Sequence, residues 1–146
     1  MKKQALFIAL LIGLVGCQPK TIKPITDLIS KVWLAETVKE GDILVYTKGA
    51  TSNAKPGYVN FRLDLSQPSK VSLIDIDGRL ITGTYTISTD NKRLILENLN
   101  PKPSNTGGVI EYYILPQPDG TTLKLERTAE SRKTGNTVNQ YALITE

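Results

Sequence analysis

Hydrophobic and polar residues alternate along most of the chain after residue 30. In the segment 58–65, Val59, Phe61, Leu63 and Leu65 share one face, and the other face is mostly polar. The segment 121–127 repeats this alternation, which is the period of a half-buried strand. Further segments are rich in β-branched and aromatic residues and complete a set of nine predicted strands: 32–38, 43–48, 70–76, 79–88, 93–99, 109–115 and 138–145.

Turn residues separate these segments. The pairs Asp77-Gly78 and Asp119-Gly120 predict two-residue hairpin turns with positive φ at both positions, and Asp90-Asn91 is a weaker example. The stretch 75–78 also resembles the start of an EF-hand calcium loop. Because the remaining ligands of such a loop are missing, we interpret the stretch as a turn and predict no metal site.

Nine short strands joined mainly by turns predict an all-β protein. A meander of strands removes its exposed edges by closing, so we expect an antiparallel up-and-down β-barrel of about eight or nine strands. A two-sheet sandwich is the alternative. The segment 25–30 follows Pro24, which is favourable in a first helical turn, and predicts one short N-terminal helical turn.

The N-terminus has the three parts of an export signal. Two lysines follow Met1, and an apolar run of 11 residues spans 5–15, too short to cross a bilayer. The sequence Leu14-Val15-Gly16-Cys17 resembles the bacterial lipoprotein box. This resemblance implies removal of residues 1–16, a lipid thioether on Cys17 and a further acyl chain such as palmitate, which together anchor a protein stably. A secreted protein with a free thiol is the alternative.

We therefore expect a signal peptide at 1–16, a lipidated tether at 17–27 and a β-barrel domain at 28–146. Gln18, rather than Asp, follows the cysteine. By the sorting rule of enterobacteria, this places the protein in the bacterial cell envelope, at the outer rather than the inner membrane.

Composition limits the possible chemistry. The 146-residue chain has no histidine, one cysteine and one methionine. Histidine is the commonest general base and metal ligand, so we expect no catalytic residue, no cofactor and no metal. Two of the 18 basic residues lie in the predicted signal, which leaves 16 against 14 acidic residues and a net charge near +2. We therefore expect no nucleic-acid partner.

A short helical turn followed by a strand with the single tryptophan, Trp33, resembles the start of lipocalins. Their first strand carries a Gly-x-Trp motif, although Ser30 and Lys31 stand in place of the glycine here. Lipocalins also pack a late arginine across this tryptophan. Arg127, at the end of the predicted eighth strand, is the matching residue, and the resemblance implies a structural cation–π contact worth about 0.5–2 kcal/mol. The resemblance covers most of residues 28–145.

A barrel of this size can hold one small ligand or be filled by its own side chains. The predicted inward-facing residues are the candidate ligand-binding set: Val59, Phe61, Leu63, Leu65, Tyr85, Tyr113, Leu123 and Leu125. We expect a monomeric, membrane-anchored, non-catalytic protein that binds a small hydrophobic ligand. The alternative is an envelope interaction module, an inhibitor or assembly factor, that displays its loops from the membrane.

The sequence does not decide which end of the predicted barrel is open to a ligand. In a simple nine-strand meander the long loops 49–57, 100–108 and 128–137 lie together at the end where the first strand begins. Long loops on a rigid scaffold favour this end as the binding end. The lipocalin resemblance implies a mouth at the opposite end.

Overall fold

The computed structural model describes residues 23–116 and 118–146. The predicted signal peptide, the lipidation of Cys17 and most of the predicted tether lie outside these residues. Within them, no helix is both long and apolar enough to span a bilayer.

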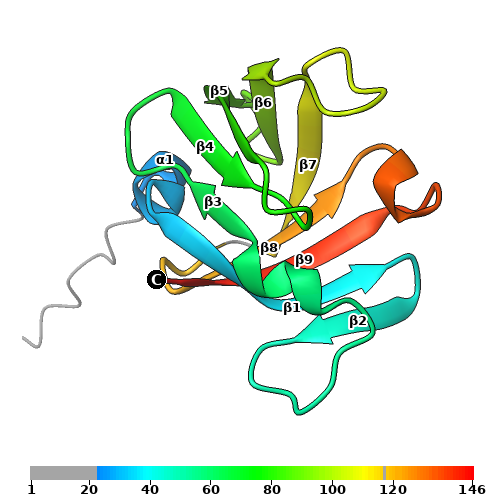
Figure 1. The fold of residues 1–146 in the computed structure, drawn as a ribbon. Helices are drawn as coiled ribbons and strands as arrows, with labels where there is room; N and C mark the ends of the chain where they lie inside the picture. Colours follow the sequence, from blue (N-terminus) through cyan, green and yellow to red (C-terminus); the bar gives the residue numbers. More distant parts are fainter. Residues whose placement is uncertain (1–22, 117) are drawn as a thin grey trace, which may run out of the picture.

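The described chain folds into nine strands with one short α-helix and two 3-10 turns (Figure 1). The helix α1 spans Ile25–Ile29, and the 3-10 turns are η1 (Pro56–Asn60) and η2 (Arg132–Thr134). The strands are β1 (Val32–Glu40), β2 (Ile43–Thr47), β3 (Arg62–Asp64), β4 (Lys70–Ile74), β5 (Leu80–Ile87), β6 (Arg93–Asn100), β7 (Ile110–Leu115), β8 (Thr122–Arg127) and β9 (Asn139–Thr145).

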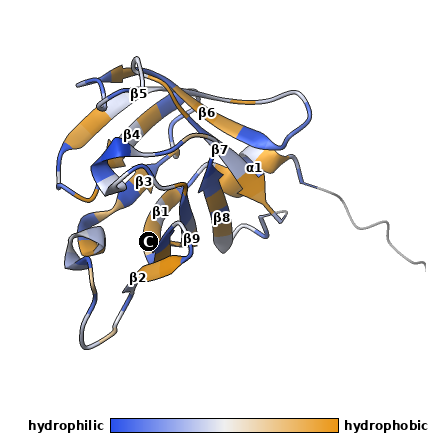
Figure 2. Cartoon of the chain, turned by 90° about the vertical axis from the view of Figure 1, so that its right-hand side faces the viewer, coloured by the Kyte–Doolittle hydropathy of each residue, from blue (hydrophilic) through white to orange (hydrophobic). Residues whose placement is uncertain are grey.

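Eight of the strands close into an antiparallel barrel. From β3 to β9 each strand pairs with the next, and β1 completes the ring by pairing with both β3 and β9. Hydrophobic and hydrophilic residues alternate along the strands (Figure 2). The predicted barrel is confirmed, and the sandwich alternative is not adopted.

The ninth strand, β2, lies outside the ring. Residues 32–34 of β1 pair with β3, and residues 37–40 of the same strand pair with β2. Because β2 and β3 follow one another along a single edge of β1, the direction of every later strand is reversed relative to a simple meander. We call the two ends the helix end, with α1 and the connections 65–69, 88–92 and 116–121, and the loop end, with 75–79, 101–109 and 128–138.

This topology corrects the predicted position of the chain start. The long connections 101–109 and 128–138 lie opposite the end where β1 begins, not beside it. With the strands placed in this way, the loop-length argument and the lipocalin resemblance predict the same end as the mouth, the loop end, and this stays a prediction.

The outer edge of β2 is covered by the loop that follows it. The Asn53 side chain accepts a hydrogen bond from the backbone N–H of Thr47 at 2.7 Å and donates one to its carbonyl at 3.1 Å. The backbone N–H of Lys55 donates to the Val45 carbonyl at 3.0 Å. These bonds occupy backbone groups that an edge strand would otherwise offer to another chain.

The start of the segment predicted as a strand at 58–65 is a helical turn. Pro56 begins η1, and a Cβ on Gly57 would lie only 2.7 Å from the carbonyl oxygen of Ile76, so this glycine allows η1 to approach the 75–79 loop closely. The turn reverses the predicted sides, because Tyr58 is buried and Val59 is 67% exposed. The prediction that Val59 faces the barrel interior is therefore wrong.

The Asp-Gly turns also differ from the prediction. In both pairs the glycine alone has a positive φ, +72° at Gly78 and +87° at Gly120. The N–H of Gly78 donates to the carbonyl of Asp75 at 2.8 Å, so the turn starts at Asp75. It therefore holds two carboxylates, those of Asp75 and Asp77, at the loop end.

The helix end is closed by apolar residues. Ile25 and Ile29 of α1 are buried with Trp33, whose indole N–H donates to the Ile29 carbonyl at 2.8 Å. This hydrogen bond fixes α1 over the end of the barrel.

The predicted contact between Arg127 and Trp33 is wrong. Trp33 pairs with Thr145, whose N–H reaches the carbonyl of Thr121, whereas Arg127 is the last residue of β8. Six residues of extended strand separate Thr121 from Arg127, roughly 20 Å. Arg127 therefore lies at the loop end, far from the tryptophan.

Replacing the α1 residue that closes this end tests its packing. Because Ile29 is fully buried, we expect Ile29→Ala to lower the free energy of unfolding by about 2–5 kcal/mol. Denaturant unfolding followed by the fluorescence of Trp33 measures this change. Thr26→Ala, on the exposed face of the same helix, is the control and should stay within about 0.5 kcal/mol of wild type. Equal stability of the two variants would contradict the role of α1.

Candidate functional site

The barrel interior changes character along its axis. Near the helix end, Leu63 pairs with Trp33, and Leu143 pairs with Leu123, so this half of the core is largely aliphatic. At the loop end the cross-strand pairs are Glu40 with Asn139 and Tyr112 with Arg127. The loop-end half therefore combines aromatic rings with polar and charged groups.

Three aromatic rings contact the ring of Tyr141, and a fourth contacts one of these three, which makes an aromatic cluster of five rings. Phe61 stacks on it with ring centroids 4.9 Å apart, and Tyr112 and Tyr58 meet it edge-on at 5.9 Å and 6.3 Å. Tyr46 follows, 6.3 Å from Tyr58. Burial raises the pKa of Tyr141 to about 12 and that of Tyr112 well above its usual value, so these hydroxyls stay protonated.

A buried carboxylate joins this aromatic cluster to the loop between β2 and β3. Glu40 is 6% exposed, accepts a hydrogen bond from the Tyr58 hydroxyl at 2.9 Å and forms an ion pair with Lys55. On β9, which pairs with the β1 strand of Glu40, the Asn139 side chain accepts a hydrogen bond from the Thr134 hydroxyl at 3.0 Å. The same side chain donates a hydrogen bond to the Tyr141 hydroxyl at 3.3 Å. These bonds fix the polar groups on both sides of the seam between β1 and β9.

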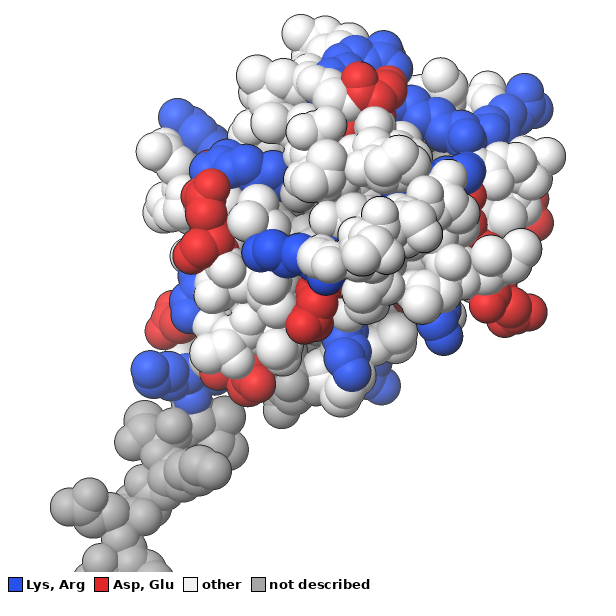
Figure 3. All heavy atoms as spheres, turned by 60° about the horizontal axis from the view of Figure 1, so that its bottom comes forward, with Lys and Arg blue, Asp and Glu red and all other residues white. Residues whose placement is uncertain are grey.

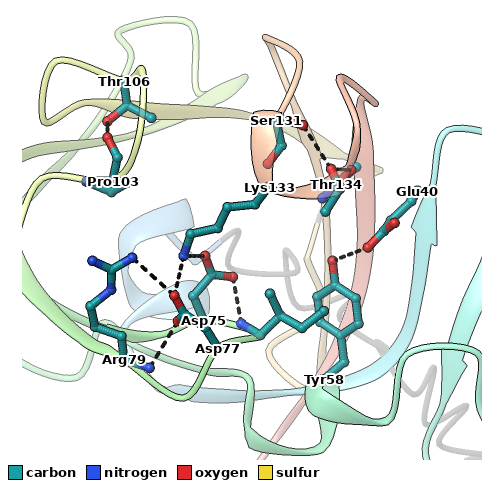
Figure 4. A network of polar contacts seen from close by, with 12 residues as sticks. Glu40, Tyr58, Asp75, Asp77, Arg79, Pro103, Thr106, Ser131, Lys133 and Thr134 are labelled. Atoms are coloured by element: carbon teal, nitrogen blue, oxygen red, sulfur yellow. Dashed lines mark hydrogen bonds and ion pairs between the residues drawn. The ribbon is translucent and has the colours of Figure 1, made fainter.

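An ion-pair bridge joins two loops at this end, and we call it the Lys133 clamp. The Nζ of Lys133, in η2, lies 2.9 Å from a carboxylate oxygen of Asp75 and 2.8 Å from one of Asp77 (Figure 4). Arg79 also pairs with Asp77 at 3.1 Å. The hydrogen bond from Lys133, followed by the backbone N–H of Arg79, lowers the pKa of Asp77 to about 2 although partial burial opposes this shift.

Arg127 is the last residue of β8 and therefore lies at the loop end of the barrel. It follows the buried residues Leu123 and Leu125 at alternate positions of β8, and therefore shares their inward side. Its Nε is buried and has no hydrogen-bond partner among the described residues. Within the same residues, no group of three acidic or cysteine side chains lies close enough to hold a metal ion.

Solvent-open hollows lie at both ends of the barrel. One of about 560 Å³ at the loop end is lined by Asn105, Glu130, Arg132 and Asn136. Another of about 450 Å³ lies between α1 and β5. On the face shown in Figure 3, basic and acidic side chains are interspersed.

Most of the predicted ligand-binding residues are buried in the barrel core: Phe61, Leu63, Leu65, Tyr85, Leu123 and Leu125. Their role in ligand binding stays a prediction. Tyr113 is 46% exposed, so the prediction that it faces inward is wrong. The alternation along β7 directs Ile110 and Tyr112 inward and Tyr113 outward.

The sequence prediction missed Tyr58, Tyr112 and Tyr141, which belong to the aromatic cluster with Phe61 and Tyr46. The alternation of Asn139, Tyr141 and Leu143 in the predicted last strand contained a signal for one of them. No pattern in the sequence indicated that these three tyrosines converge.

Comparison with known proteins finds no matching family and no matching curated protein. Two solved structures are similar to the chain. A lipocalin-like protein from Bacteroides uniformis has a TM-score of 0.49 and 12% identity, over 82% of this chain and 99% of that one. An uncharacterized protein from Bacteroides eggerthii has a TM-score of 0.47 and 10% identity, over 80% and 98% of the two chains. The similarity concerns the course of the backbone alone, and the fold assignment depends on the strand pairing described above.

The Lys133 clamp makes a prediction about acid titration. In Lys133→Met, the pKa of Asp77 should rise from about 2 toward its ordinary value of 3.8, and NMR titration of the side-chain carboxyl carbon measures it. Because the folded-state pKa lies below the unfolded one, the pair stabilises the fold above pH 3.8, and this contribution is lost as the pH falls toward 2. Asp90, which bonds to Ser88, is the control and should titrate as in wild type. An unchanged Asp77 titration would show that the clamp does not form in solution.

Proposed function

We propose that the protein is a non-catalytic binding protein, anchored to a bacterial envelope membrane, that takes one small and largely hydrophobic molecule into the loop end of its barrel. The observation that supports this most directly is the aromatic and polar composition of the loop-end half of the interior. The helix-end half is already closed by aliphatic packing around Trp33 and by α1.

A barrel filled only for stability would not need these aromatic and polar residues in its interior. Burying a hydroxyl or a charged group costs free energy unless its hydrogen bonds are replaced, and aliphatic side chains fill the other half without that cost. Ligand sites, in contrast, combine apolar and aromatic walls with a few polar groups that orient the bound molecule. The arrangement of Tyr58, Tyr112 and Tyr141 beside Glu40 and Arg127 follows the second pattern.

The Lys133 clamp holds the loop end in its closed form. It joins the 75–79 loop to η2 through three side chains, each partly exposed. Ligand entry requires these loops to separate. The apparent affinity is therefore the intrinsic affinity multiplied by the fraction of molecules in the open form.

The proposed anchor fits this geometry. Residue 23 and α1 lie at the helix end, so a lipid on Cys17 would hold that end toward the membrane. The loop end would then point away from the membrane, where a ligand or another protein can reach it.

The second candidate function is an interaction module, and exposed apolar side chains on β2 and η1 favour it. Ile43, Leu44 and Val59 are 68%, 53% and 67% exposed, and all three lie outside the closed ring of strands. Exposed apolar groups of this kind are common in protein contacts. Serine at all three positions would abolish partner binding under this alternative and leave ligand binding unchanged.

Tyrosine NMR tests the binding site. With labelled tyrosine rings and the full chain in phosphatidylcholine nanodiscs, octan-1-ol should produce saturable shifts at Tyr58, Tyr112 and Tyr141. The exposed Tyr113 and the helix-end Tyr85 are internal controls and should not move. Lys133→Met should tighten the apparent affinity, because it removes the clamp that favours the closed form. The absence of saturable shifts at the three interior rings would exclude the proposed site.

The anchor is tested by Cys17→Ser. We expect wild type to incorporate labelled palmitate and to fractionate with membranes, because two acyl chains anchor a protein stably. The variant should lose the label and keep its precursor length, since cleavage before the cysteine depends on its modification. Gln18→Ala is the control and should be processed as wild type. Equal palmitate labelling of the serine variant would rule out the lipoprotein assignment.

A further inference from the structure

Arg127 has no ion-pair partner among the residues that the structure describes. Arg127 is directed inward from the end of β8, opposite Tyr112 on β7, and its Nε is fully buried without a hydrogen-bond partner. Among the described residues it forms no ion pair, whereas the acidic groups Glu40, Asp75 and Asp77 at this end do. Glu40 is paired with Lys55, and the carboxylates of the 75–79 loop are paired with Lys133 and Arg79.

A buried Nε without a hydrogen-bond partner is costly for the fold, although Arg127 as a whole is only half-buried. A buried charge is tolerated when an opposite charge and hydrogen bonds replace its hydration, and Arg127 lacks both at its Nε. The inward positions before it on the same strand, Leu123 and Leu125, are apolar, so a hydrophobic residue would continue the pattern at lower cost. Because Arg127 destabilises the fold and makes no ion pair within the described residues, it is a candidate for contact with another molecule.

The neighbouring hydroxyl can act with Arg127. Tyr112 is Arg127's partner across the strand pair and is 2% exposed, and its hydroxyl bonds to no other side chain within the described residues. Burial raises the pKa of Tyr112 well above its usual value, which keeps its hydroxyl as a neutral donor. A guanidinium and a phenol hydroxyl are both donors, and they face the same half of the barrel.

We propose that Arg127, assisted by Tyr112, binds the acidic head group of the ligand, a carboxylate or a phosphate. This inference rests on the proposed function and narrows the ligand from a hydrophobic molecule to an amphipathic anion. The guanidinium can donate two parallel hydrogen bonds to such a group, and these charge-assisted bonds are about twice as strong as neutral ones. The apolar part of the ligand would then lie against the rings around Tyr141.

The test compares head groups on one alkyl chain. Octanoate, octyl phosphate and octan-1-ol are titrated by calorimetry into the full chain in phosphatidylcholine nanodiscs, and empty nanodiscs provide the blank. For wild type we expect octanoate or octyl phosphate to bind at least about tenfold more tightly than octan-1-ol, as the strength of hydrogen bonds to charged groups implies. The better of the two anions identifies the head group.

Arg127→Met removes the charge and keeps the side chain long. It should lose the preference for the anion, measured as the ratio of the dissociation constants of octanoate and octan-1-ol in the same variant, and the free variant should be at least as stable as wild type. Arg127→Lys, which keeps the charge without the planar fork, should recover part of the preference. Arg62→Met is the matched control, because Arg62 already pairs with Asp64 and Glu146.

The outcomes separate the two proposals. If octan-1-ol binds wild type as tightly as both anions, or if Arg127→Met keeps the anion preference, Arg127 is not the head-group site although the barrel still binds ligand. If none of the three compounds binds wild type, the proposed function fails as well. If Arg127→Met does not fold, Arg127→Lys decides, and an unchanged anion affinity in that variant overturns the inference.

Discussion

The pairing of β1 with β9 is the interaction on which the rest of the structure depends. It joins the first strand of the domain to the last, from Trp33 opposite Thr145 to Glu40 opposite Asn139. Because β1 also pairs with β3 and β2, one strand closes the ring and carries the extra hairpin. Without this seam the barrel would have two exposed edges, and the covering of the β2 edge by Asn53 would protect only one side of an open sheet.

The candidate site is a consequence of the same seam. Glu40 and Asn139 face each other across it at the loop end, and each is bonded to a tyrosine hydroxyl, that of Tyr58 or that of Tyr141. The seam therefore positions the aromatic cluster, while the Lys133 clamp joins the 75–79 loop to η2 at the same end. The two halves of the interior have different roles, since one closes the barrel and the other combines donors with apolar rings.

Alternation in two segments, and β-branched and aromatic composition in the other seven, was sufficient to locate all nine strands, because these signals depend only on neighbouring residues. These local signals did not predict which residues pair across neighbouring strands, or which side chains of a strand face inward. Trp33 and Arg127 could be placed on the right strands. Their separation along the barrel axis, however, depends on which residues pair. The pairing is set by bulges and by the edge of β1 that β2 and β3 share. Likewise, Tyr112 and Tyr113 are adjacent in the chain, so an error of one residue selects the wrong ring as inward-facing. The convergence of the site residues is a long-range property that no local pattern records.

The separation of the aromatic residues gives the molecule two independent spectroscopic probes. The single indole, Trp33, is buried at the helix end, whereas Tyr46, Tyr58, Tyr112 and Tyr141 lie together near the other end. Partial opening of the loops would change the environment of the phenol rings and leave indole emission constant, while global unfolding would change both. Local opening of the loop end can thus be distinguished from loss of the fold within one unlabelled sample, because different chromophores report on the two events.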